Sequence, residues 1–178
     1  MKMNANTNIK KLILSALFLA LGIVLPLFTA QIKEIGDSLL PMHLAVMLCA
    51  FLCGKYSLFV GFMLPFMRSF LFGMPPIYPN AVYMALELFA YALVICILQK
   101  RLKIKGIAKI YVSLISAQLL GRVVWGASKA VLLGLSGKAF TFSAFIIGGF
   151  ADAVIGIALQ LILIPTIVML VKKAEKTN

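Results

Sequence analysis

The stretch from Arg68 to Tyr91, RSFLFGMPPIYPNAVYMALELFAY, joins two strongly apolar segments through the turn Gly73–Pro76. Proline lacks a backbone donor and restricts the residue before it, so a helix or strand cannot run unbroken through Pro75, Pro76 and Pro79. The polar side chains around this break are Arg68, Tyr78, Asn80, Tyr83 and Glu87. Polar groups beside a broken helix in an otherwise apolar chain predict a binding site at this place.

The composition predicts an integral membrane protein. Of the 178 residues, 63% are apolar and 12% are charged, and the mean hydropathy is +1.08. A soluble domain is about half apolar and about a quarter charged. The formal net charge of +12 would suggest nucleic-acid binding in a soluble protein, but here the positions of the charges indicate membrane topology instead.

Six apolar segments follow one another along the chain. A helix that crosses the bilayer core needs about 20 residues. The segments cover residues 9–30, 39–53, 56–72, 79–98, 107–135 and 142–170. We therefore predict an all-α membrane protein, a bundle of six transmembrane helices that forms a single domain over residues 1–178 with short tails at 1–8 and 172–178. No small-residue cleavage site follows the first segment, so we interpret it as a retained helix and not as a signal peptide.

Lysine and arginine are divided unevenly between the two ends of these segments. One end carries 12 of them, at positions 2, 10, 11, 55, 100, 101, 103, 105, 109, 172, 173 and 176. The opposite loops carry only Lys33 and Lys138. Cytoplasmic loops hold the excess of positive residues, so we predict a bacterial plasma-membrane protein with both termini in the cytoplasm. The turn at 73–76 and the loop at 31–38 would then face outside.

Ionisable residues are also expected inside the outer half of the spans: His43, Arg68, Glu87, Arg122, Lys129 and Asp152. A charge in an apolar span costs roughly 3 kcal/mol and faces either a partner or a water-filled cavity. One interpretation is that internal pairs lock the bundle, with Glu87 bound to Arg68 or Arg122 and Asp152 bound to Lys129. The other is a substrate site, because the cations outnumber the carboxylates and the surplus suits an acidic ligand.

Aromatic side chains accompany these charges. Tyr83, Glu87 and Tyr91 recur at four-residue steps, which places them on one helix face. Such a stripe suits a flat or amphipathic small molecule. The predicted substrate-binding residues are Arg68, Asn80, Tyr83, Glu87, Arg122, Trp125, Lys129 and Asp152. We interpret His43 as a hydrogen-bonded residue at a helix end.

The sequence contains no pattern that predicts catalysis. Cys49, Cys53 and Cys96 lie in apolar segments without a ligand spacing for a metal, and Ser128 has no neighbouring base. No GxxxxGK[ST] motif is present, so an ATPase would have to be another chain. We therefore expect a protein that is not an enzyme and that takes no metal, cofactor or nucleic acid.

Residues 16–20, ALFLA, form an AxxxA step, a small-residue surface on which another helix packs closely. Together with the six short spans and the outward polar cluster, this step makes the chain resemble the substrate-binding S components of energy-coupling factor (ECF) vitamin transporters. The similarity extends from Lys10 to Lys172. The stretches LLPMHLAVMLCAFLCGKYSLFVGF, LPFMRSFLFGMPP, MALELFAY and GRVVWG are similar to the branch for folate, pantothenate, pyridoxine and hydroxymethylpyrimidine.

The resemblance implies a subunit for vitamin uptake. It would bind a water-soluble vitamin or vitamin precursor from outside with high affinity, and pantothenate or a B6 vitamer is favoured. It would dock through Ala16 and Ala20 onto a transmembrane coupling subunit driven by two ATPase subunits, with the loops 31–38 and 73–77 as lids over the site. The alternative is a stand-alone secondary transporter of a small organic solute, although such carriers usually show repeated halves and this chain shows none.

Overall fold

The computed structural model describes residues 5–29 and 40–177, and these residues form helices without any strand. The helices are α1 (Ala5–Thr29), α2 (Pro41–Cys53), α3 (Tyr56–Phe72), η1 (Ile77–Ala81), α4 (Val82–Arg101), α5 (Ile107–Leu135), α6 (Phe142–Ile146), η2 (Ile147–Ala151) and α7 (Val154–Thr177). The segment η2 is a single turn of π-helix, whereas η1 is kinked at Tyr78, whose backbone is extended. The prediction of an all-α chain is confirmed over these residues.

Four helical stretches in the described part are long and apolar enough to cross a membrane: 6–29, 77–101, 107–135 and 154–174. The helices α2 and α3 and the α6–η2 segment are shorter but also apolar. Large apolar side chains such as Phe28, Phe59 and Leu119 are exposed, as expected where lipid covers the bundle. Transmembrane helices are thus confirmed, whereas the count of six spans, the single domain and the cytoplasmic termini stay predictions.

Helix α2 forms the centre of the bundle. It packs against α1, α3, α4 and α7, and ten of its 13 residues are buried. A helix that is apolar on all sides belongs in a core, because no face of it favours water. At about 1.5 Å per residue, α2 is roughly 20 Å long and therefore shorter than the core of a bilayer. The first turn of α2 lies inside the protein, and His43 in this turn is only 3% exposed.

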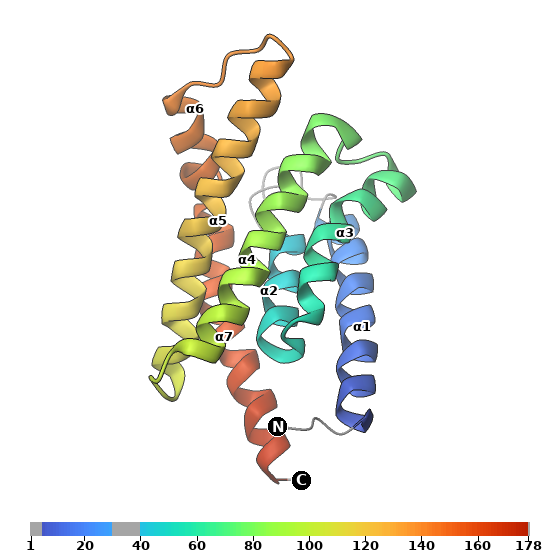
Figure 1. The fold of residues 1–178 in the computed structure, drawn as a ribbon, viewed down its shortest axis with the longest axis vertical. Coiled ribbons are helices and arrows are strands. Elements are labelled where there is room, and N and C mark those ends of the chain that lie inside the picture. The colour runs from blue at the N-terminus through green and yellow to red at the C-terminus, as the bar shows by residue number, and fades with distance from the viewer. Residues whose placement is uncertain (1–4, 30–39, 178) are drawn as a thin grey trace.

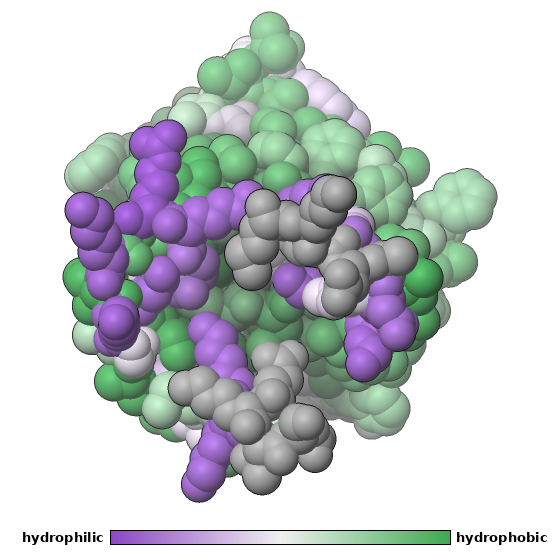
Figure 2. All heavy atoms as spheres, turned by 60° about the horizontal axis from the view of Figure 1, so that its bottom comes forward, coloured by the Kyte–Doolittle hydropathy of each residue, from purple (hydrophilic) through white to green (hydrophobic). Residues whose placement is uncertain are grey.

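The two ends of the molecule differ in character. The beginning of α1, the connection between α4 and α5, and the end of α7 lie at one end (Figure 1). Hydrophilic side chains gather on this end (Figure 2). The lysines and arginine exposed there include Lys10, Lys55, Lys100, Arg101, Lys103, Lys105, Lys172 and Lys173. The connection from α3 to α4 and the α6–η2 segment lie at the opposite end (Figure 1). The predicted lid at 31–38 falls outside the described residues.

The segment expected as one helix over 142–170 is broken. The chain leaves η2 through a turn at Asp152 and Ala153 before α7 begins. The Asp152 backbone N–H donates to the Ile147 carbonyl over 2.9 Å, a five-residue step that widens the helix. Two consecutive glycines, Gly148 and Gly149, weaken the regular helix at this place because glycine has a low helix propensity.

Candidate functional site

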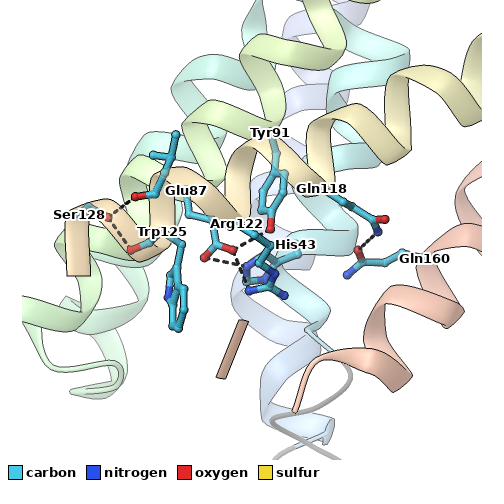
Figure 3. A network of polar contacts seen from close by, with 9 residues as sticks. His43, Glu87, Tyr91, Gln118, Arg122, Trp125, Ser128 and Gln160 are labelled. Atoms are coloured by element: carbon cyan, nitrogen blue, oxygen red, sulfur yellow. Dashed lines mark hydrogen bonds and ion pairs between the residues drawn. The ribbon is translucent and has the colours of Figure 1, made fainter. Parts of the chain in front are cut away.

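The carboxylate of Glu87 lies at the centre of a polar cluster inside the bundle (Figure 3). Its Oε1 atom accepts hydrogen bonds from the Tyr91 hydroxyl at 2.7 Å and from Arg122 Nη1 at 2.9 Å. Its Oε2 atom lies 3.3 Å from His43 Nε2. Glu87 is 1% exposed, Arg122 4% and His43 3%. Three helices, α2, α4 and α5, therefore meet at a single carboxylate.

The local structure of each helix explains why these groups meet. Glu87 and Tyr91 are one turn apart on α4, so their side chains lie on the same face. The Tyr91 ring fits against Gly121 of α5, where a Cβ atom would lie only 2.3 Å from a ring carbon. This close approach brings α4 and α5 together beside Arg122. The short helix α2 then supplies His43, whose ring meets that of Tyr91 edge-on with centroids 5.6 Å apart.

Hydrogen-bonding capacity remains in this cluster. Arg122 Nε and His43 Nδ1 are buried and have no hydrogen-bond partner among the described residues. A buried donor without a partner costs roughly 1–3 kcal/mol, so such groups usually meet water or a ligand. The cluster thus combines a carboxylate that is already paired with polar atoms that remain available.

A second cluster lies between α4 and α5, nearer the end of the molecule that carries α6. The ammonium of Lys129 lies over three rings, 4.5 Å from the centroid of Trp125, 5.3 Å from Phe140 and 5.5 Å from Tyr83. Tyr83 and Trp125 meet edge-on with centroids 6.2 Å apart. Each cation–π contact contributes about 0.5–1 kcal/mol at an exposed site and more where water is excluded. Lys129 is therefore held in place by aromatic faces.

The α6–η2 segment covers the aromatic side of this cluster. The Phe145 ring lies 6.2 Å from Trp125 and fits over Gly126, where a Cβ atom would lie 2.4 Å from the ring. Gly148 and Gly149 pass next to the Trp125 indole. Glycine is required at Gly126 because any larger residue would displace the Phe145 ring.

A third polar contact joins α5 to α7. Gln118 Nε2 donates to Gln160 Oε1 over 2.9 Å, and both side chains are buried (Figure 3). The Nε2 atom of Gln160 has no hydrogen-bond partner among the described residues. Gln118 is one turn from Arg122 on the same face of α5. Polar side chains thus extend along one face of α5 from Gln118 to Lys129.

The structure brings together five of the eight residues predicted for the site. Glu87 and Arg122 form the deep pair, and Tyr83, Trp125 and Lys129 form the aromatic cluster. The other three lie elsewhere. Arg68 of α3 donates from Nη1 to the Met42 sulfur at 3.3 Å, Asn80 lies half-buried in η1, and Asp152 is exposed in the turn before α7.

The structure also decides between the pairings considered from the sequence. Glu87 pairs with Arg122, at 2.9 Å. Within the described part of the chain, Lys129 forms no ion pair with Asp152, because the aromatic rings hold its ammonium instead. The turn at 73–77, predicted as a lid, continues into Tyr78. The Tyr78 hydroxyl donates to the Leu132 carbonyl of α5 at 3.3 Å and thereby ties this connection to α5.

Sequence reasoning noted His43 as an ionisable residue at a helix end and Tyr91 on the stripe of Glu87, but it left both out of the predicted substrate-binding set. It did not identify four further members of these clusters: Gln118, Phe140, Phe145 and Gln160. For Gln118 a signal existed, since it lies one turn from Arg122 on the same helix. Phe140, Phe145 and Gln160 come from separate elements, and no spacing along the chain links them to Glu87 or Lys129.

The side chains of these clusters differ in the chemical groups with which they can interact. Among the described residues, no three His, Cys, Asp or Glu side chains are grouped as a metal site would require. The aromatic faces suit a planar or apolar group, Lys129 suits an anion, and the buried Arg122 Nε suits a hydrogen-bond acceptor.

Comparison with known proteins adds one result. The model of a protein family described as "ECF transporter, substrate-specific component" matches residues 10–168. No curated protein and no solved structure matched the chain.

The pair of Glu87 and Arg122 can be tested by a double-mutant cycle. We expect Arg122→Met to lower the free energy of unfolding by about 3–5 kcal/mol, because it leaves the Glu87 carboxylate buried with its strongest partner removed. The double variant Glu87→Gln/Arg122→Met should regain part of this loss. Thermal unfolding in detergent, followed by circular dichroism, measures both variants and the single variant Glu87→Gln, which completes the cycle. The exposed Lys138→Met serves as the control, and strictly additive losses would contradict the coupling.

Proposed function

The chain belongs to the ECF transporter substrate-specific component family, and we propose that it binds a water-soluble vitamin or vitamin precursor from outside with high affinity. In this proposal it then delivers the vitamin inward as part of an ATP-driven ECF transporter. Members of this family are substrate-binding transport proteins, and ATP hydrolysis lies in separate subunits. The observation that carries the proposal is the family match over residues 10–168.

The orientation that we propose puts the basic end in the cytoplasm. The start of α1, the α4–α5 connection and the end of α7 gather there, together with most of the exposed lysines (Figure 2). Positive residues remain on the cytoplasmic side of membrane proteins, which supports a bacterial plasma-membrane location with both termini inside. The Lys129 cluster then lies toward the outer side, from which a vitamin would arrive.

We propose that the polar and aromatic clusters between α4 and α5 form the vitamin site. Lys129 would bind an acidic group of the substrate, and the Tyr83 and Trp125 rings would contact its apolar part. Support comes from the geometry of Lys129, whose ammonium lies over three aromatic rings and whose side chain is half-buried. A cation at such a site favours an acid such as pantothenate over a neutral B6 vitamer.

The coupling subunit would dock on α1. Ala16 and Ala20 are one turn apart and both are exposed, whereas Gly22 faces inward against Leu64 of α3. The small alanines leave a shallow surface on which a partner helix could approach closely. The proposed partners are a transmembrane coupling subunit and two ATPase subunits.

Mass spectrometry of the small molecule that co-purifies with the chain is the direct test of the proposed function. A vitamin or vitamin precursor at one molecule per chain is the expected result. Uptake of that compound by cells that contain the chain but lack the coupling and ATPase subunits would instead indicate a stand-alone secondary transporter.

The role of Lys129 leads to a prediction about substrate charge. We expect Lys129→Met to weaken pantothenate binding about tenfold or more, because a charge-assisted hydrogen bond contributes about 1.5–3 kcal/mol. Binding of neutral pyridoxine should change little. Titration calorimetry in detergent measures both affinities, and Lys138→Met at the same end of the molecule is the control. Unchanged pantothenate affinity in Lys129→Met would rule out this role.

The docking proposal predicts that substitutions on α1 abolish uptake without weakening vitamin binding. Ala16→Trp and Ala20→Trp should abolish uptake into cells, because the large ring prevents close helix approach, while vitamin binding in detergent stays intact. Ala158→Trp places the same ring on an exposed position of α7 and should leave uptake unchanged. Normal uptake by both α1 variants would show that docking takes place elsewhere.

A further inference from the structure

One of the three rings around the Lys129 ammonium comes from outside α4 and α5. Tyr83 belongs to α4 and Trp125 to α5, and both side chains are buried. Phe140 instead lies in the connection from α5 to α6, where residues 138–141 have no regular secondary structure (Figure 1). The centroid of its ring lies 5.3 Å from the Lys129 ammonium. A segment outside the helices thus supplies the third ring.

Few side chains attach this connection to the bundle. Among residues 136–147, all of which the structure describes, only Phe140 and Phe145 are partly buried and the others are exposed. Both rings contact the indole of Trp125, with centroids 6.0 Å and 6.2 Å from it. The ring of Phe145 also fits over Gly126 of α5. The position of the Phe140 ring therefore depends on contacts with one short stretch of α5.

The rings restrict a side chain that is otherwise costly to order. A lysine has many rotamers, and a ligand that binds its ammonium loses affinity when it must fix that side chain first. Three ring faces attract the Lys129 ammonium and restrict it before a ligand arrives. Among the described residues no carboxylate pairs with this ammonium. An acidic ligand would thus meet a cation that is already positioned and has no anionic partner.

We propose that Phe140 is a positioning residue of the vitamin site. Its ring holds the Lys129 ammonium where an acidic group of the substrate binds, and it thereby favours acidic over neutral substrates. This inference rests on the proposed function, in which Lys129 binds that group. It also makes the α5–α6 connection part of the site, because the ring set is complete only when the connection lies on Trp125.

Titration calorimetry in detergent with pantothenate and neutral pyridoxine tests the role of the ring. Phe140→Leu keeps an apolar side chain but removes the aromatic face. It should weaken pantothenate binding about two- to fivefold, which corresponds to one cation–π contact, and leave pyridoxine binding unchanged. Phe140→Tyr keeps the aromatic face and should bind both vitamins like the unaltered chain.

The control for this experiment is Phe142→Leu, which makes the same change on α6 where the ring is 77% exposed. It should leave both affinities unchanged. Equal weakening of pantothenate and pyridoxine binding by Phe140→Leu would indicate a role in packing alone and would overturn the proposal. Unchanged pantothenate affinity in that variant would overturn it as well.

A second measurement needs no vitamin. Trp125 is the only tryptophan of the chain, so its fluorescence reports on this cluster alone. The Lys129 ammonium lies 4.5 Å from the centroid of the indole and should attract the anionic quencher iodide, but not the neutral quencher acrylamide. In an uncharged detergent, Phe140→Leu should lower the ratio of iodide to acrylamide quenching, as Lys129→Met should.

The quenching ratio separates this proposal from the proposed function. An unchanged ratio in Phe140→Leu would show that the ring does not position the ammonium, whatever the affinity for vitamins. If the unaltered chain binds neither vitamin, the proposed substrates are wrong, and the ratio still decides whether Phe140 positions Lys129.

Discussion

The buried carboxylate of Glu87 constrains three helices at once. An ion in an apolar interior costs several kcal/mol unless its partners are in place, so α2, α4 and α5 must hold the register that brings His43, Tyr91 and Arg122 to it. The rest of the bundle packs around this arrangement: α3 on α4, and α1 and α7 on α2. A sequence with only apolar residues at these positions would pack as well but would leave the register of the helices less strictly defined.

The two charged clusters between α4 and α5 differ in how deeply they are buried. The pair of Glu87 and Arg122 is almost fully buried, whereas Lys129 is half-buried and held by aromatic faces two turns further along α5. An acidic group that approaches from the end carrying α6 would meet Lys129 first. It could bind there without breaking the deep pair, whose separation would cost several kcal/mol. The pair of Glu87 and Arg122 is thus suited to hold α4 and α5 in place around the proposed site. Lys129 is suited to contact a ligand that enters it.

The sequence predicted features that depend on residues close together in the chain, but not contacts between elements far apart in it. Apolar segment lengths predicted the helices, and the four-residue step from Tyr83 to Glu87 placed both on one face. The contact between His43 and Glu87 could not be predicted, because it depends on how deeply the start of the short α2 lies in the bundle. The break after η2 was also missed, since 142–170 is mostly apolar and the position of Phe145 over Gly126 is a tertiary contact.

Helix α2 packs against α1, which carries the proposed docking surface, and against α4, which carries Glu87. Helix α1, which carries Ala16 and Ala20, packs mainly on α2 and α3. Helix α2 in turn places His43 against Glu87, 3.3 Å from its carboxylate. A partner that shifts α1 would act on α2 directly, and movement of α2 would change the distance between His43 and the Glu87 carboxylate. Packing thus connects the proposed docking surface to the charged cluster through one short, mostly buried helix.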